Sequence, residues 1–170
     1  MWQYDGRQRP EFAQEPDPSQ ESVWDYPRPP ALQRCLRRVR VRDGLQLIAD
    51  STAGVRVLET ASPPTIYLPS EDVDLGALIE ARGQSFCEWK GLARYWALKR
   101  DPAAGPVAWS YPDPSSSFAR IRGFLCFYPG RISCLLDDEQ VRPQEGGFYG
   151  GWVTDEIVGP WKGKPDTGHW

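Results

Sequence analysis

The segment 86–91 holds the residues with the clearest chemical potential, a carboxylate and an ammonium group two positions apart. Alternate side chains of an extended strand point to opposite faces, which would put Glu88 and Lys90 on one face and Cys87 and Trp89 on the other. Such a pair could bind a polar ligand or work as an acid and a base in catalysis. The alternative interpretation is a strand face that only contacts solvent.

Aromatic residues and one arginine are expected near this pair. Tyr95 lies on the next predicted strand, and Trp109 and Tyr111 lie on a strand predicted to pair nearby. Arg131 follows the aromatic strand that ends at Tyr128, and a guanidinium at the rim of a sheet can hold a phosphate or carboxylate through two hydrogen bonds. A structural salt bridge would explain Arg131 equally well.

A glycine-rich segment at 146–152 carries two further candidates, Tyr149 and Trp152. Glycine lets a backbone approach a ligand or a sheet closely. The spacing of these glycines differs from that of phosphate-binding loops, and no clear helix follows them. The pattern therefore favours structural packing over phosphate binding.

Other polar clusters point less clearly to chemistry. Arginines at 37, 38, 40 and 42 make a basic strand, which indicates either a solvent-exposed face or an anionic partner. The serines at 115–117 are typical of a helix cap. A serine–histidine–aspartate site is not supported, because the single histidine, His169, is next to last in the chain.

The composition of the 170 residues predicts one domain rich in short strands. Hydrophobic residues make up 40% of the chain and charged residues 25%, which is enough for a packed core. The 17 prolines and 16 glycines favour strands joined by ordered loops over a helix bundle. Eight tryptophans, seven tyrosines and six phenylalanines can fill a core and line a pocket as well.

Charge and hydropathy exclude several classes of protein. No apolar stretch approaches the roughly 20 residues that a membrane span needs, so no membrane partner is expected. The N-terminus has no apolar signal core, which predicts a cytoplasmic protein. The net charge of −3 argues against a general nucleic-acid-binding protein. The sequence leaves a homo-oligomer open.

The four cysteines, Cys35, Cys87, Cys126 and Cys134, are widely spaced and form no CxxC pair. A zinc site is hard to build without local ligand pairs, so reduced and mostly buried thiols are expected. The sequence therefore predicts no metal site and no cofactor.

The hydrophobic pattern predicts an arm followed by a single domain. Residues 1–21 are acidic and rich in proline with no apolar period, which indicates a flexible arm, whereas residues 22–170 form the β-rich domain. Asp43 and Gly44 are predicted to join a hairpin. Ser70 is predicted to cap a short helix over 71–81. The whole pattern predicts a mainly β fold of about eight or nine short strands, with one or two short helices and a long ordered C-terminal loop.

Several motifs occur together in an order that resembles a known family. They are VWDYPRPP (23–30), VLET (57–60), CEWKG (87–91), AWSYPDP (108–114), FYPGR (127–131), GGFYGGW (146–152) and VGPWKG (158–163). Over residues 22–170 the chain closely resembles the bacterial and cyanobacterial domain of unknown function 427. The resemblance implies a compact β-rich fold of the Mss4-like or β-tent kind.

The resemblance carries two further expectations. Relatives in that broad fold group often bind zinc through paired CxxC ligands, which this chain lacks. A family label also suggests nucleotidyltransferases, but no Gly-Ser motif with a following Asp-x-Asp pair is present, and the nearest spacing, Asp72 and Asp74, falls in a predicted helix start. The segment 164–167 departs from the Pro-Gly-Thr expected there, which puts the tight turn of that tail in doubt.

The leading hypothesis is a cytoplasmic β domain that binds a small polar or anionic molecule in an aromatic-lined cleft. The first alternative is an enzyme acting on a small, nucleotide-like substrate there, with Glu88 as acid or base and Lys90 tuning its pKa. The second alternative is a protein-interaction module that uses residues 27–30, the acidic arm and exposed tryptophans. The candidate ligand-binding residues are Tyr95, Trp109, Tyr111, Tyr128, Arg131, Tyr149 and Trp152.

Overall fold

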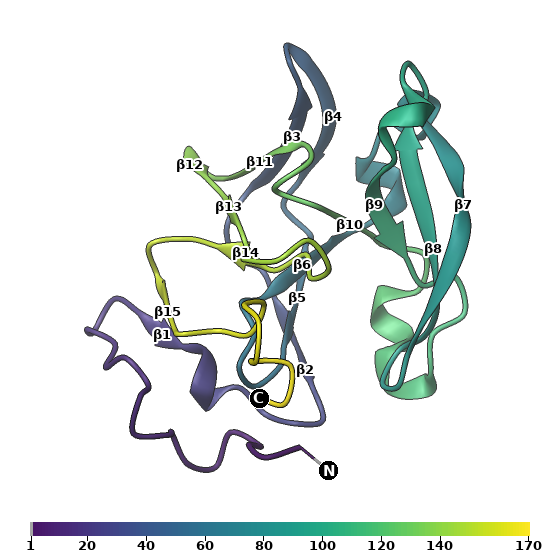
Figure 1. Ribbon diagram of the computed structural model, residues 1–170. Helices are drawn as coiled ribbons and strands as arrows, with labels where there is room; N and C mark the ends of the chain where they lie inside the picture. The colour runs from purple at the N-terminus through teal and green to yellow at the C-terminus, as the bar shows by residue number, and fades with distance from the viewer. Residues whose placement is uncertain (1) are drawn as a thin grey trace.

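Two antiparallel sheets make up most of the computed structural model, which describes residues 2–170 (Figure 1). The larger sheet has seven strands in the order β2-β5-β6-β10-β9-β8-β7. The prediction of a mainly β fold is confirmed, because strands hold 38% of the chain and helical turns only 11%. The strands of the larger sheet are β2 (Ala31–Arg34), β5 (Val55–Leu58), β6 (Thr65–Leu68), β7 (Leu78–Cys87), β8 (Gly91–Leu98), β9 (Pro106–Ser110) and β10 (Leu125–Phe127).

The smaller sheet has four strands in the order β12-β11-β3-β4. Two pairs of two-residue strands complete the fold, one of them parallel and formed by the N-terminal and C-terminal segments. These short strands carry no alternation long enough to be seen in the sequence. The remaining strands are β1 (Glu21–Ser22), β3 (Val39–Asp43), β4 (Gln46–Ser51), β11 (Ser133–Leu136), β12 (Glu139–Gln140), β13 (Arg142–Pro143), β14 (Trp152–Val153) and β15 (Ile157–Val158).

The predicted hairpin at Asp43 and Gly44 is confirmed, with its turn shifted by one residue. Asp43 pairs with Gln46, so Gly44 and Leu45 form the two-residue turn. Gly44 has a φ of 59°, the positive value that such a turn requires and that glycine adopts without strain. Leu45 is 98% exposed at the tip.

The predicted helix over 71–81 is wrong. Two 3-10 turns, η2 (Ser70–Asp72) and η3 (Leu75–Ala77), occupy its first part, and strand β7 begins directly after them. The Asp74 carboxylate accepts a hydrogen bond from the Gly76 N–H, a local contact that competes with regular helical pairing. The rest of the segment pairs with β8 along the longest hairpin of the molecule, and this pairing outweighs a weak local helix signal.

The other helical turns are equally short. They are η1 (Val23–Asp25), η4 (Pro102–Ala104) and η5 (Ser116–Ile121), the last of which begins among the serines that are typical of a helix cap. None of the helical turns in residues 2–170 has the length or apolarity of a membrane-spanning helix.

The seven-stranded sheet divides its side chains between two apolar clusters. Ile66 of β6 and Leu125 of β10 face the smaller sheet and pack with Val39 and Val41 in the main core. Their neighbours in the chain point the other way, as alternation along a strand requires, and Tyr67 belongs to the second cluster. The second cluster is the face of the sheet on which the candidate site lies.

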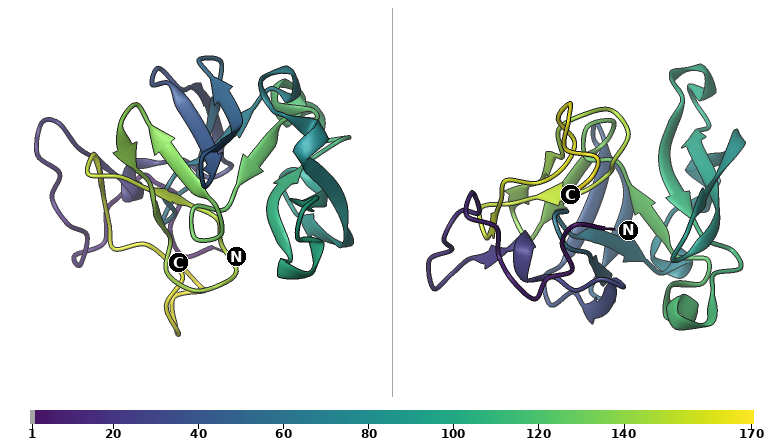
Figure 2. Two further views of the ribbon diagram at one scale, coloured as in Figure 1. Left: turned by 90° about the horizontal axis from the view of Figure 1, so that it is seen from above. Right: turned by 60° about the horizontal axis from the view of Figure 1, so that its bottom comes forward.

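The arm and the C-terminal segment pack together at one end of the molecule. Both termini lie close to each other in Figures 1 and 2. The rings of Tyr4 and Phe12 meet Trp24 edge-on at centroid distances of 5.1 and 5.3 Å, and Phe12 also stacks on Trp170 at 5.0 Å. Trp24 is fully buried beneath them.

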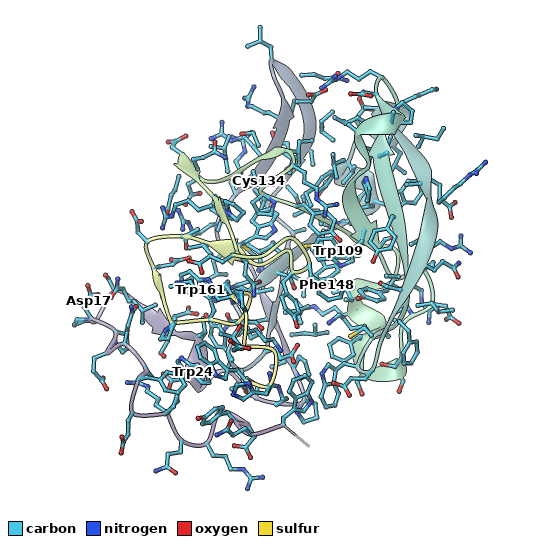
Figure 3. All side chains as sticks on the ribbon, in the orientation of Figure 1. Asp17, Trp24, Trp109, Cys134, Phe148 and Trp161 are labelled. Atoms are coloured by element: carbon cyan, nitrogen blue, oxygen red, sulfur yellow. The ribbon has the colours of Figure 1, made fainter. Side chains whose placement is uncertain are left out.

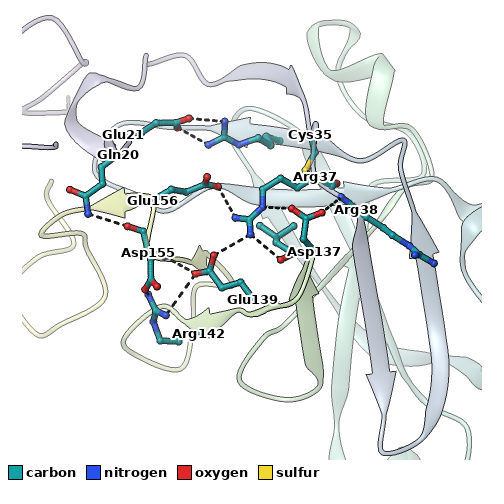
Figure 4. Close-up of polar contacts among 12 residues, drawn as sticks. Gln20, Glu21, Cys35, Arg37, Arg38, Asp137, Glu139, Arg142, Asp155 and Glu156 are labelled. Atoms are coloured by element: carbon teal, nitrogen blue, oxygen red, sulfur yellow. Dashed lines mark hydrogen bonds and ion pairs between the residues drawn. The ribbon is translucent and has the colours of Figure 1, made fainter. Parts of the chain in front are cut away.

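The arginines expected on one basic strand only partly lie on a strand, because β3 begins after Arg38, and three of them find partners within this chain (Figure 4 shows those of Arg37). Arg37 forms ion pairs with Asp137, Glu139 and Glu156 at 3.0, 3.1 and 3.2 Å. Arg38 pairs with Asp50, and Arg40 pairs with Asp138. These ion pairs neutralise three of the four arginines for which the sequence allowed an anionic partner.

Candidate functional site

A cleft of about 710 Å³ lies over the face of the seven-stranded sheet that carries the second cluster. Strands β5, β6, β8 and β9 form its floor, and the β7–β8 hairpin with its turn forms one side. The loop between β13 and β14 forms another side, and Trp2 of the arm lies at the edge. In Figure 3, Trp109 of the floor and Phe148 of the loop are labelled on this side of the molecule.

Nearly all the residues singled out in the sequence line this cleft. The structure brings together Glu88, Lys90, Tyr95, Trp109, Tyr111, Tyr128, Arg131 and Tyr149. Trp152 is not among the lining residues. Its side chain is fully buried in the main core, where its indole N–H donates to the Phe127 carbonyl oxygen at 3.0 Å.

The floor is an array of aromatic rings held by hydrogen bonds. The Trp109 indole N–H donates to the Tyr67 hydroxyl at 2.9 Å, and the Trp109 and Tyr128 ring centroids are 4.5 Å apart. The hydroxyls of Tyr95 and Ser85 share a hydrogen bond of 2.6 Å. Burial raises the pKa of Tyr67 and Tyr111, because a phenolate there would lose its hydration. The floor therefore offers uncharged aromatic faces to a ligand at neutral pH.

The glycine-rich loop lies directly against the floor. A methyl group at Gly150 would collide with the Trp109 ring, so a residue without a side chain is needed for the loop to lie this close. Arg131 fastens the loop, since its guanidinium donates to the carbonyl oxygens of Pro106 and Gly147 at 2.9 and 3.3 Å. The same guanidinium stacks on the Tyr128 ring, 4.1 Å from the centroid.

Glu88 and Lys90 line the cleft, although the strand geometry expected for them is wrong. Cys87 pairs with Gly91, so the residues between them form the turn of the hairpin and do not alternate between two faces. A Glu88 carboxylate oxygen accepts a hydrogen bond from the Trp2 indole N–H at 3.1 Å. The Lys90 side chain turns inward instead.

Lys90 is a buried lysine whose ammonium group rests among aromatic rings. The residue is 8% exposed, and its Nζ lies 5.7 Å from the ring centroids of both Tyr111 and Phe118. Cation–π contacts of this kind replace part of the hydration that the ammonium group loses. They do not neutralise its charge.

Lys162 is a second buried lysine in the cleft, and the sequence analysis missed it. The residue is 3% exposed, and its Nζ lies 4.6 Å from the Trp2 ring centroid and 5.4 Å from that of Tyr149. A signal exists in the chain, because the tripeptide Trp-Lys-Gly occurs at 89–91 and again at 161–163. Both lysines of this repeated tripeptide line the same cleft.

Burial lowers the pKa of Lys162, because the ammonium form loses its hydration there. The nearby Glu59 carboxylate opposes this shift, while the positive charges of Arg28 and Lys90 add to it. Among residues 2–170, neither lysine of the cleft has a carboxylate oxygen within 4.0 Å of its Nζ. Their charges are therefore left without a direct counter-ion.

The cleft as a whole is positive, in contrast to the chain. Four basic residues line it, Arg82, Lys90, Arg131 and Lys162, against the two acidic residues Glu59 and Glu88. Glu59 is already paired with Arg28 at 3.2 Å. The full chain has a net charge of −3. The positive charge is thus concentrated where the aromatic faces are.

All four cysteines are free thiols in the structure. Cys35, Cys126 and Cys134 are buried, and Cys87 is half-buried in the cleft. Within the described part of the chain, residues 2–170, no group of three or more histidine, cysteine, aspartate or glutamate side chains is arranged to hold a metal ion.

Ellman's reagent is expected to modify Cys87 alone in the native protein. Burial raises the pKa of the Cys126 and Cys134 thiols, so little of the reactive thiolate forms there at neutral pH. In urea all four thiols should react, and Cys87→Ser should abolish the native reaction. Equal rates of modification of Cys87 and Cys126 in the native protein, measured by peptide mass spectrometry, would contradict this prediction.

A family model described as Domain of unknown function (DUF427) matches residues 31–138, and no curated protein matches the chain. The matched region holds the floor of the cleft and the turn with Glu88 and Lys90. Trp2, Tyr149 and Lys162 lie outside it, in the terminal segments that enclose the cleft. Because the match spans more than half of the sequence, the chain belongs to the DUF427 family.

Proposed function

We propose that the cleft binds a small organic anion that carries a planar group. The observation that supports this most directly is Lys90, a residue only 8% exposed whose ammonium group has aromatic neighbours but, among residues 2–170, no carboxylate oxygen within 4.0 Å. A buried charge without a counter-ion is costly, and an anionic ligand would supply that counter-ion on binding. The surplus of basic side chains around the cleft also favours a negatively charged ligand.

The aromatic floor is the reason to expect a planar group on the ligand. The Trp109 and Tyr128 rings line the cleft, and flat ligand groups stack on aromatic rings of this kind. Phe86 and Phe148 stand at the rim, 73% and 78% exposed, where they could cover a bound ring. The volume of about 710 Å³ is in the usual range for small-molecule sites.

Thermal unfolding with matched anionic and neutral compounds tests the proposal. The panel would contain inorganic phosphate, a nucleoside monophosphate with its nucleoside, and benzoate with benzamide. We expect the aromatic anions to raise the melting temperature more than their neutral counterparts. A ligand at 100 times its Kd adds about 2.7 kcal/mol to the free energy of unfolding, which is readily measured.

Lys90→Met is expected to abolish the stabilisation by these anions while keeping the fold, since the methionine side chain can stay among the same rings. The matched control is Lys99→Met, which removes an exposed lysine just after β8. Equal stabilisation by benzoate and benzamide, or full stabilisation of the Lys90→Met variant, would contradict the proposal.

A further inference from the structure

Lys162 is held in place by buried hydrogen bonds on both sides of its backbone. Its N–H donates to the Ala61 carbonyl oxygen at 3.0 Å, and its own carbonyl oxygen accepts from the Gln144 side chain at 2.6 Å. Gln144 is only 4% exposed and also accepts from the Gly151 N–H at 3.1 Å. The backbone of Lys162 is thereby fixed to the loop that forms the wall of the cleft.

The amine of Lys162 faces the cleft without a hydrogen-bond acceptor among residues 2–170. Its Nζ lies over the rings of Trp2 and Tyr149. The charged groups close enough to influence it are Glu59, Arg28, Glu88 and Lys90. Both carboxylates already have partners. Glu59 forms an ion pair with Arg28, and Glu88 accepts a hydrogen bond from the Trp2 indole.

An amine in such a place differs chemically from an exposed lysine. Desolvation and neighbouring positive charges lower its pKa, so a larger share of Lys162 is the neutral amine at neutral pH. The neutral amine carries the lone pair that attacks a carbonyl carbon. The other cations of the cleft, Lys90 and Arg131, remain to hold an anionic group.

We propose that Lys162 is a nucleophilic amine that forms an imine with a small carbonyl compound bearing an anionic group. The proposal rests on the proposed function, since the anionic group of the carbonyl compound is the anion that the cleft is proposed to bind. The substrate class is therefore an aldehyde or ketone acid, or an aldehyde or ketone that carries a phosphate.

The reaction balances without an oxidant or another reactant. The Lys162 nitrogen attacks the carbonyl carbon and forms a C–N bond, and the oxygen becomes a hydroxyl group. That hydroxyl group then leaves, and the two hydrogens of the amine end in the water molecule that departs. The product is a carbon–nitrogen double bond between Lys162 and the substrate carbon.

Reductive trapping with glyoxylate tests the proposal on the wild-type chain. Glyoxylate is a small aldehyde with a carboxylate, and borohydride reduces its imine to a stable carboxymethyl-lysine that peptide mass spectrometry locates. We expect Lys162 to be trapped faster than the exposed lysines Lys99 and Lys164, which serve as internal controls. Lys162→Met should lose the fast labelling, and Lys162→Arg should lose it while keeping the positive charge.

The outcomes separate this proposal from the proposed function. Trapping only at Lys99 and Lys164, in a protein that aromatic anions still stabilise, would overturn the imine and leave anion binding intact. Absence of any stabilisation by the anions would overturn the proposed function itself. The wild-type labelling map is decisive even if the Lys162→Met variant fails to fold.

Discussion

Arg28→Met is expected to lower the free energy of unfolding by about 3–5 kcal/mol, the usual cost of removing one partner from a buried ion pair. The Arg28 side chain is 2% exposed and pairs with Glu59. It also donates to the carbonyl oxygens of Tyr4, Thr60 and Trp170 at 2.8, 2.9 and 3.2 Å. One guanidinium thus joins the arm, the body and the C-terminus.

Methionine would fill much of the same space and leave all four acceptors without their donor. Buried acceptors that lose a donor contribute the largest part of such a loss. Urea unfolding would measure the change, with Arg7→Met as the control, because the Arg7 side chain is 88% exposed and, among residues 2–170, forms an ion pair with Asp5 alone. The control should leave stability unchanged. A loss below about 1 kcal/mol in Arg28→Met would show that the buried pair is not what holds the terminal segments.

The sequence predicts the parts of the fold that depend on neighbouring residues. The hairpin at Asp43 and Gly44 is predicted to within one residue, because its turn depends on local residues such as Gly44. Alternation along β6 and β10 separates the core face from the face with Tyr67, since both strands lie between two packed layers. The helix expected over 71–81 failed for the opposite reason, because pairing with β8 decides that segment.

The sequence indicates most of the aromatic residues that line the cleft, including Tyr149, but not Trp2 and Lys162. Trp109 and Tyr128 could be expected near Glu88 and Lys90 because adjacent strands carry them. Trp2 and Lys162 approach the same cleft from terminal segments far away in the chain. The Trp2 hydrogen bond to Glu88 spans 86 positions, and no local pattern encodes such a contact.

Glu88 and Lys90 line the cleft because they lie in a turn, and not because they alternate along a strand as the pattern suggests. Alternation assumed that the strand continued through both residues, whereas the hairpin turns between Cys87 and Gly91. Gly91 has a φ of 101°, which only glycine adopts readily, and this residue closes the turn. In a turn the side chains need not alternate, so Lys90 turns inward, whereas Glu88 stays exposed and accepts a hydrogen bond from Trp2.

Trp152→Ala is expected to lower the free energy of unfolding by about 3–5 kcal/mol, as is usual when a large aromatic side chain is removed from a core. Trp152 is 1% exposed, and the Phe127 carbonyl oxygen would lose the indole donor. Urea unfolding would measure the loss. A loss within about 1 kcal/mol would mean that the surrounding core closes over the cavity.

The effect of Trp152 on ligand binding should differ from its effect on stability. The milder change Trp152→Phe keeps an aromatic ring in the core, and because the side chain does not line the cleft, the folded variant should bind aromatic anions with unchanged Kd. Trp109→Phe is the matched variant, since Trp109 forms the floor and its indole orders Tyr67. Calorimetry at a temperature where both variants are folded should show weaker binding only for Trp109→Phe. Weaker binding in Trp152→Phe alone would instead give Trp152 the ligand-binding role expected from its glycine-rich motif.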